Sequence, residues 1–437
     1  MCLRGLGRLA AGGGAIVGIA FCLLASHAWG QEPRPGRASD QPSAPGTGPP
    51  RVLESPVLPL SAYPLELLGL LAPPSQRGPV TLLPSISVSE EYNDNVSLNN
   101  QTRQWDLITG FSPAITLFVN RPSYEFRGGY SFTAELYERE SHLNNAFDRQ
   151  NFVATGLYRA ARGFTLTASD SFVLSRNTNL VASQGFASGR QESWGNTFSP
   201  GMTWQMTPRD SLSLGATYGV LRFKGAGLDS NTYGLQSRLN HVLTPRLTST
   251  IGYGFTYLDV QGQENSTTHA PTLGVSYRLT PTLTGSVSGG PAITQLGGET
   301  FMSPGGTASL VQALRFGSAS VQYTRAVGAA GGFGGTTDTQ SASGTLTLST
   351  WQRGLLVVFS PAYSIAESVG RGQAERVDVR ALTVNLGVTY QLARFVSVFG
   401  GYTFFQQRTG GSSSVRADVD QDRVRVGLQF GYPINFD

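Results

Sequence analysis

A run of carboxylates and amides near residue 90 is the most distinctive candidate for binding chemistry in this sequence. The run is Ser89-Glu90-Glu91-Tyr92-Asn93-Asp94-Asn95. Its oxygen-bearing side chains are those of Glu90, Glu91, Asn93, Asp94 and Asn95. Calcium is a hard cation that binds through oxygen ligands, so the run could form a cation site. The same residue types are typical of an Asx-rich turn at the end of a strand, and the sequence favours that interpretation.

Catalytic chemistry has little support. The four histidines are His27, His142, His241 and His269. None stands at a metal-ligand spacing from another His, Asp or Glu. Ser141 precedes His142, but such a pair is more typical of a solvated loop than of a nucleophile and its base. The glycine run 328–335 lacks the Lys-Ser/Thr and the helix of a phosphate-binding loop, so it predicts a flexible external loop. We therefore expect no enzyme, no metal site and no cofactor.

A third set of candidates is charged and recurs at every second position of alternating segments. These residues are Arg127, Arg238, Arg278, Arg423, Arg425, Glu125 and Glu135. If they surround a water-filled passage, their charge sets its ion selectivity, and unpaired arginines favour anions or acidic sugars. The alternative is a network of salt bridges that supports the wall, and the two roles are compatible.

Strands must position these side chains. In residues 124–136 Tyr124, Phe126, Tyr130 and Phe132 alternate with polar or small residues. Residues 423–432 repeat the pattern. A period of two is that of a β-strand, whose side chains point alternately to opposite faces. One face is apolar and the other is too small and too polar to fill a core, which is typical of a transmembrane β-barrel.

Turn signals divide the chain from about Pro84 onward into strands. Short turns such as Thr207-Pro208-Arg209-Asp210 alternate with longer polar loops such as 175–189 and 406–415. Eight short turns and nine long loops join eighteen strands, and sixteen is the alternative number. An antiparallel up-and-down barrel with an even number of strands has both chain ends on one side. Asp170 falls on the apolar face, and a bulge there would restore the phase.

The N-terminal residues 1–30 predict a cleaved signal peptide. Arg4 and Arg8 precede an apolar run, and Ala28-Trp29-Gly30 supplies a small-residue cleavage site. Both cysteines, Cys2 and Cys22, lie in this segment, so we expect a mature chain without disulfides or thiolate sites. The formal net charge of +4 is too small to indicate a nucleic-acid partner.

Residues 31–83 form a Pro-rich lead that cannot bury a core, so we expect it to be largely disordered in the periplasm. It contains one apolar patch, residues 64–72, which prolines frame as a short helix. Docking of this patch at the barrel mouth is one interpretation, and a weakly ordered patch is the other. The barrel itself is expected over residues 84–437.

Three segments of the barrel resemble a known family. They are Leu83–Asn95, Phe111–Ile115 and Tyr130–Tyr137, preceded by the Pro-rich lead. They are similar to the β-barrel porin 2 family of Gram-negative outer-membrane proteins, some of which are encoded in exopolysaccharide operons. The resemblance implies an outer-membrane location and a connection with polysaccharide. It implies no catalytic residues.

The sequence therefore predicts an exported porin-like channel of the outer membrane for passive or guided passage of hydrophilic solutes. Its expected partners are outer-membrane lipids, lipopolysaccharide, the barrel-assembly machinery and components of polysaccharide export, and not nucleic acid. A sealed structural or adhesive barrel is the first alternative. A barrel hydrolase, which needs a nucleophile and a base brought together across strands, is the second.

Overall fold

The computed structural model describes residues 79–182, 184–349, 354–369, 376–411 and 417–436. Contacts divide the chain into the units Met1–Glu54 and Ser55–Asp437, and all described residues belong to the second. The predicted signal peptide, the Pro-rich lead up to residue 78 and the apolar patch 64–72 lie outside the described residues. No helix in the described part of the chain is long and apolar enough to cross a membrane.

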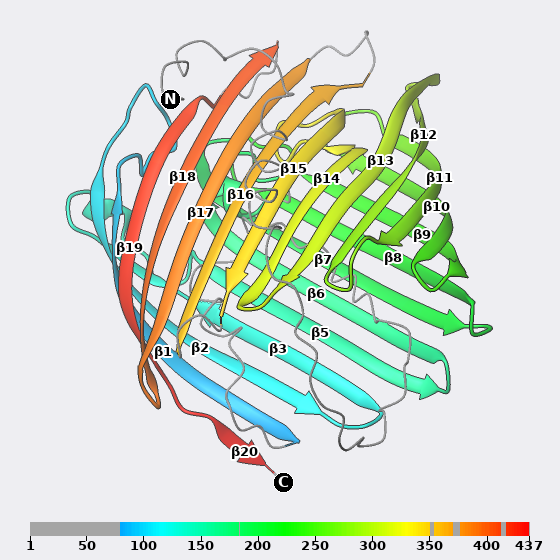
Figure 1. The fold of residues 1–437 in the computed structure, drawn as a ribbon. Coiled ribbons are helices and arrows are strands. Elements are labelled where there is room, and N and C mark those ends of the chain that lie inside the picture. The colour runs from blue at the N-terminus through cyan, green and yellow to red at the C-terminus, as the bar shows by residue number, and fades with distance from the viewer. Residues whose placement is uncertain (1–78, 183, 350–353, 370–375, 412–416, 437) are drawn as a thin grey trace, which may run out of the picture. The chain divides into compact units, whose positions relative to one another are not determined.

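The described residues form an antiparallel β-structure (Figure 1). The first ten strands are β1 (Val80–Asn93), β2 (Asp106–Asn120), β3 (Tyr124–Phe132), β4 (Ala134–Tyr137), β5 (Gln150–Ala161), β6 (Phe164–Asn177), β7 (Arg190–Gln205), β8 (Asp210–Phe223), β9 (Ser230–Thr244) and β10 (Leu247–Val260). The others are β11 (Ser266–Arg278), β12 (Leu283–Leu296), β13 (Glu299–Leu314), β14 (Gly317–Ala329), β15 (Thr336–Leu348), β16 (Leu355–Ser368), β17 (Val377–Ala393), β18 (Val396–Gly411), β19 (Val419–Gly431) and β20 (Ile434–Phe436). Two short 3₁₀ helices, η2 (Ser141–Leu143) and η3 (Thr178–Leu180), lie in the loops.

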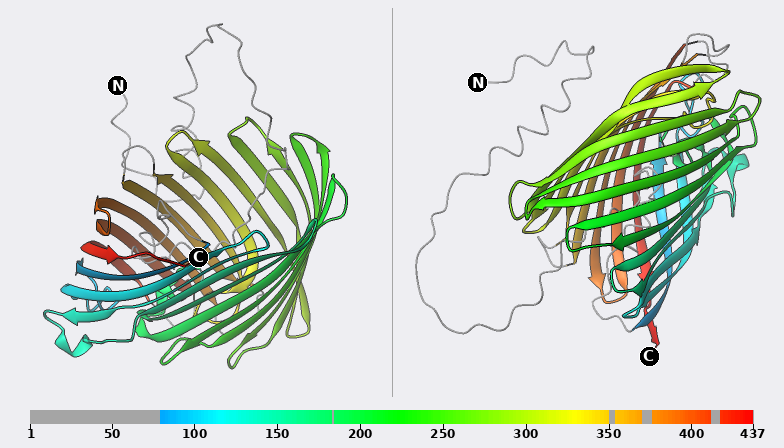
Figure 2. Two further views of the ribbon diagram at one scale, coloured as in Figure 1. Left: turned by 90° about the horizontal axis from the view of Figure 1, so that it is seen from below. Right: turned by 90° about the vertical axis from the view of Figure 1, so that its right-hand side faces the viewer.

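From β5 to β19 consecutive strands pair with each other, β1 pairs with β2, and β19 pairs with β1, so the sheet closes on itself (Figure 2). β3 and β4 are two parts of one wall strand, since both pair with β2. β20 continues the closing edge after β19 by pairing with Val80–Leu82. The wall therefore has eighteen strands, and the predicted fold class and strand number are confirmed. The first strand begins at Val80, four residues before the predicted boundary at Pro84.

The two faces of the wall differ as the alternation predicts. Large apolar side chains point outward and remain exposed, for example Leu273 at 68% and Ile251 at 60%. The opposite face carries mainly serine, threonine, glycine and glutamine. The short hairpins, such as the one between β9 and β10, lie at one end, which we call the short-turn end. The long loops, such as residues 94–105, lie at the other, the long-loop end.

The predicted bulge at Asp170 is wrong. The register of β6 with β5 and β7 is continuous at this residue, and it shifts only near the strand ends, between Arg159 and Ala161 of β5 and between Ser175 and Asn177 of β6. Asp170 therefore stays on the outer face. There the side-chain amide of Asn196 donates a hydrogen bond to its Oδ1 at 2.8 Å. This hydrogen bond satisfies one carboxylate oxygen without a change of register.

Candidate functional site

The inner face of strands β12–β15 is a wall of hydroxyl groups. Ser286 and Ser288 of β12 face Ser309 and Thr307 of β13, with hydroxyl separations of 2.7 and 3.0 Å. The alternating positions of β15, from Thr337 to Thr347, are all serine or threonine. Within the described residues, no inner position of β12, β14 or β15 is charged. This wall can exchange hydrogen bonds with water or with a hydroxylated solute, and Glu299 at the start of β13 is the charged residue among its described inner positions.

The opposite side of the interior, from β19 across β1 to β5, carries five of the seven charged residues that the sequence suggested. Arg127 lies with its guanidinium 5.2 Å from the ring centre of Phe118 on β2. Glu125 forms an ion pair with Arg159 of β5. Glu135 accepts a hydrogen bond from Nη1 of Arg149 at 3.0 Å. The two glutamates that the sequence suggested thus have arginine partners within the wall.

Arg238 and Arg278 occupy inner positions on β9 and β11. Arg238 is half-buried, and its side chain lies beside Gly252 of the next strand, where a Cβ would stand 3.7 Å from Arg238 Cγ. Arg278 is also half-buried and ends β11 at the short-turn end. The structure therefore does not bring the seven sequence candidates into one ring. They lie on several strands at different heights along the barrel.

Arg423 and Arg425 join the last wall strand to the first. Nε of Arg423 lies 3.1 Å from Oε1 of Glu91. Nε and Nη2 of Arg425 donate to Oγ of Ser89 at 2.9 and 2.7 Å. Arg423 is 9% exposed and Arg425 4%. Of the two roles that the sequence left open for these arginines, their partners on the neighbouring strand β1 favour support of the wall.

The run 89–95 belongs to this same junction. Glu90 points to the outer face, where Thr109 donates to it at 2.7 Å, whereas Glu91 points inward. The backbone N–H of Asn95 donates to Oδ1 of Asn93 at 3.0 Å, which is the Asx turn that the sequence favoured. Asp94 forms an ion pair with Arg103 of the following loop. The five residues do not converge on one point, because successive side chains of a strand alternate between faces.

The end of β1 and the loop after it form further hydrogen bonds with β19. Nε2 of Gln421 donates to Oδ1 of Asn93 at 3.1 Å and to the carbonyl of Asn95 at 2.8 Å. The backbone N–H of Asp420 donates to Asn100 Oδ1 at 2.8 Å, and the Asn100 amide donates back to Asp420 at 2.8 Å. The motif that resembled a cation site therefore contributes to closing the barrel.

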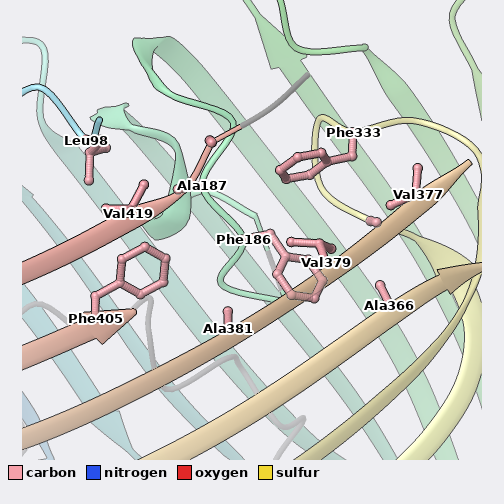
Figure 3. Close-up of a cluster of buried hydrophobic side chains, with 12 residues drawn as sticks. Leu98, Phe186, Ala187, Phe333, Ala366, Val377, Val379, Ala381, Phe405 and Val419 are labelled. Carbon is pink, nitrogen blue, oxygen red and sulfur yellow. The ribbon is translucent and has the colours of Figure 1, made fainter. Parts of the chain in front are cut away.

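Two loops fold into the barrel from the long-loop end, which the sequence did not predict. These inner loops are residues 178–189, of which 183 is not described, and residues 330–335. Figure 3 shows Phe186 and Phe333 of the inner loops against the inner wall. The buried cluster comprises Leu98, Phe186, Ala187, Ala330, Phe333, Ala366, Val377, Val379, Ala381, Phe405, Ala417 and Val419. The predicted flexible external loop at 328–335 is thus wrong, since its apolar residues bury themselves inside.

Gln407 fixes the first inner loop. Its side chain is fully buried and bonds the backbone of Ala187 twice, donating to the carbonyl at 2.7 Å and accepting from the N–H at 2.8 Å. The second inner loop is held by its neighbours, since Leu228 N–H donates to Gly332 O at 3.0 Å. Gly331 has a positive φ, and a Cβ there would lie 2.5 Å from Ala182 Cβ. Glycine therefore permits the close approach of the two inner loops.

The sequence contained one signal for the inner loops. At the start of β17 the inner positions Val377, Val379 and Ala381 are apolar, whereas the rule elsewhere is small and polar. The residues that alternate with them, Asp378 and Arg380, are charged, and apolar side chains on the inner face of a barrel strand indicate that something covers it. The sequence did not identify the covering loops, because Phe186 and Phe333 belong to other segments of the chain and no local pattern links them to β17.

The histidines show no catalytic grouping among the described residues. His241 pairs with Asp210 at 2.7 Å, His142 lies 3.4 Å from Glu140, and His269 Nδ1 is 2.7 Å from the Tyr253 hydroxyl. No group of three or more His, Cys, Asp and Glu in the described part of the chain is placed to hold a metal ion.

No family model matches the chain, and no curated protein matches it. Among solved structures, it is similar to OpdO of Pseudomonas aeruginosa at 13% identity and a TM-score of 0.41, over 81% of this chain and 97% of that one. It is similar to OccAB4 of Acinetobacter baumannii at 11% identity and a TM-score of 0.41, over 83% of this chain and 100% of that one. It is also similar to the siderophore receptor PirA of P. aeruginosa at 10% identity and a TM-score of 0.39, over 83% of this chain and 81% of that one. Membership of the β-barrel porin 2 family stays a prediction.

Proposed function

We propose that the protein is a porin-like channel of the Gram-negative outer membrane, through which hydrophilic solutes pass. The observation that carries this proposal is the contrast between the two faces of a closed eighteen-strand wall. The outer face exposes large apolar side chains and the inner face exposes hydroxyl groups. Barrels with this many strands are wide enough to leave an aqueous passage.

The outer face supports the membrane assignment. Aromatic side chains lie toward both ends of the wall, such as Trp204 near the short turns and Tyr92 with Trp105 near the long loops. Such rings suit the level of lipid head groups. With the long loops outside the cell, the short-turn end lies in the periplasm. Export by a cleaved signal peptide, assembly by the barrel-assembly machinery and a link to polysaccharide export belong to the same proposal.

The inner loops favour a second candidate, a barrel that is sealed in its resting state. They occupy part of the interior at the long-loop end and are fixed by buried apolar contacts and by Gln407. In this candidate the protein has a structural or adhesive role. A catalytic role has no comparable support in the described residues.

Conductance of the purified mature chain in planar lipid bilayers tests the proposal. We expect discrete single-channel steps that scale with the conductivity of the salt solution, because the hydroxyl wall holds water. Liposomes that contain the protein should also take up small sugars. A protein that is folded, resists proteolysis and yet shows neither steps nor uptake would be the sealed barrel.

A further inference from the structure

The short-turn end of the barrel carries a series of arginines. Six of the short turns with described residues contain one, and these are Arg121, Arg162, Arg209, Arg246, Arg315 and Arg394. Arg162, Arg209 and Arg246 are exposed. Arg278 ends β11 beside them, and its backbone N–H donates to the carbonyl of Arg246 at 2.8 Å. Positive charge is thus distributed around this mouth.

Backbone hydrogen bonds connect the turns into one rim. Gln205 N–H donates to Gly163 O at 2.7 Å, which joins the turn of Arg162 to the end of β7. Val242 N–H donates to Arg209 O at 2.9 Å, which joins the next turn to β9. Neighbouring strands are roughly 4.8 Å apart, and successive turns at one end of the barrel are two strands apart. The separation between such turns, roughly 10 Å, is comparable to the Debye length at physiological salt. The potentials of arginines on successive turns therefore overlap at the mouth.

Acidic residues are scarce at this end and abundant at the other. Near the short turns, the described carboxylates are those of Glu125 and Asp210, which pair with Arg159 and His241. The carboxylates of the long-loop end include Asp94, Asp338, Glu367, Asp378, Asp418, Asp420 and Asp422. Four of them, Asp94, Asp338, Asp378 and Asp420, form ion pairs with arginines of the same end. The barrel thus has an electropositive short-turn mouth and a long-loop end with many acids.

Two of the turn arginines lie near aromatic rings at the short-turn end. Arg315 lies 5.3 Å from the ring centre of Phe316, and Arg394 lies 5.0 Å from that of Phe395. The Phe395 ring packs on Phe430 and Tyr432 of the outer face. A cation over an interfacial aromatic ring suits lipid head groups. We therefore separate these two from Arg162, Arg209 and Arg246, which we call the rim arginines.

We propose that the rim arginines capture an acidic oligosaccharide or polysaccharide at the periplasmic mouth and lead it into the channel. This inference rests on the proposed channel function and names its substrate class. Guanidinium groups recognise carboxylates through paired hydrogen bonds, and a ring of them suits a chain that carries several carboxylates. The hydroxyl wall of β12–β15 then offers hydrogen-bond partners to the sugar hydroxyls. Because the positive charge lies at the short-turn mouth, anions are concentrated at that mouth.

The test compares two variants with equal changes of charge. The first replaces Arg162, Arg209 and Arg246 by glutamine. The matched control replaces Arg103, Arg380 and Arg408, which are exposed arginines of the long-loop end, by glutamine. The probes are oligogalacturonate, as an acidic chain, and a maltooligosaccharide of similar length, as a neutral chain. Both are added to either side of a bilayer that holds channels in one orientation.

We expect oligogalacturonate to interrupt the current from the periplasmic side, with an apparent dissociation constant that rises about tenfold in the rim variant at low salt. Raising the salt to about 1 M should remove the difference, because the Debye length falls to about 3 Å. The control variant and the neutral chain should show no such change. Equal blockade of the wild type and the rim variant, with conductance intact, overturns the inference and leaves the channel function standing.

Binding of labelled oligogalacturonate to the detergent-solubilised protein tests capture even if the barrel does not conduct. Loss of this binding in the rim variant but not in the control supports the inference. If the rim variant changes only the dependence of insertion on phosphatidylglycerol in the bilayer, the rim arginines bind lipid head groups and the inference is wrong.

Discussion

At the scale of single residues, the arginines inside the barrel differ in what they can do. Arg423 and Arg425 are almost wholly buried and are bonded to Glu91 and Ser89 of the neighbouring strand. Such groups hold strands together and offer little charge to a passing ion. An arginine on a turn costs nothing in desolvation and acts on the solution through its potential. The identity of a residue therefore does not decide its role, whereas its partners do.

The Arg423–Glu91 pair gives the first prediction. Glu91→Gln leaves the buried guanidinium without its counter-charge, and losing one partner of a buried pair costs about 3 kcal/mol. We expect a lower free energy of unfolding for the folded barrel in detergent, measured by urea titration of its β-sheet circular dichroism. Arg380→Gln removes an arginine that is 55% exposed on its side chain and should change stability by less than about 1 kcal/mol.

The exchange Glu91→Arg with Arg423→Glu provides the internal control. It restores opposite charges between the same two diagonal positions, and because Glu91 stands directly opposite Arg425 we expect it to recover only part of the lost stability. Equal stability of the wild type and Glu91→Gln would show that the pair contributes nothing to closure.

At the scale of elements, the inner loops determine how much of the interior stays open. Phe186 and Phe333 bury their rings against the inner faces of β16–β19. Gln407 adds two hydrogen bonds to one residue of the first loop. Burial and hydrogen bonding thus act on the same loop, and removing either should loosen it.

Gln407→Ala is the second prediction, and the chain supplies a matched control in the preceding residue. Gln406 points to the outer face and donates to Asp420 at 3.0 Å. Gln407→Ala leaves the buried N–H and C=O of Ala187 without their partner, which costs roughly 1–3 kcal/mol and releases the loop. We expect a larger mean single-channel conductance and longer open times for Gln407→Ala and no change for Gln406→Ala. Identical recordings for both variants would mean that the loop does not restrict the passage.

The strands were predictable from the sequence, whereas their long-range partners were not. Alternation with period two is a local property of the sequence, so it correctly predicted strands at residues 124–132 and 423–431. Turn chemistry likewise located the hairpins at Thr207–Asp210 and Thr244–Arg246. The bonds between Ala187 and Gln407 and between Glu91 and Arg423 span 220 and 332 residues. Nothing local in either segment specifies such a partner.

At the scale of the whole described barrel, closure and charge polarity act together. Closure removes the free edges that an open sheet would expose to lipid. In the proposed function, the long-loop end and the arginines of the short-turn end face different compartments. Under this proposal, a solute with carboxylates meets attraction at the short-turn mouth, whereas several acids of the long-loop end are paired with arginines. The proposal therefore implies that acidic solutes enter preferentially from the short-turn end.

The last prediction tests closure and register directly. Val88 of β1 and Leu428 of β19 are register partners on the outer face. Directly opposed residues in an antiparallel pair have Cα atoms roughly 4.5–5.5 Å apart, within the range that a disulfide needs. Since we expect no cysteine in the mature chain, Val88→Cys with Leu428→Cys should form one intramolecular cross-link on oxidation. It should appear as a mobility shift on denaturing gels that a reductant reverses.

The matched control pairs Val88→Cys with Val426→Cys. Val426 lies opposite Glu90, so it is displaced by two residues along β19 from the partner of Val88. Diagonal neighbours of this kind are about 7–8 Å apart, which is too far for an unstrained disulfide. We expect little cross-linking in this variant. Efficient cross-linking of the control but not of Val88 with Leu428 would place the closing pair in another register, and it would move Glu91 away from Arg423.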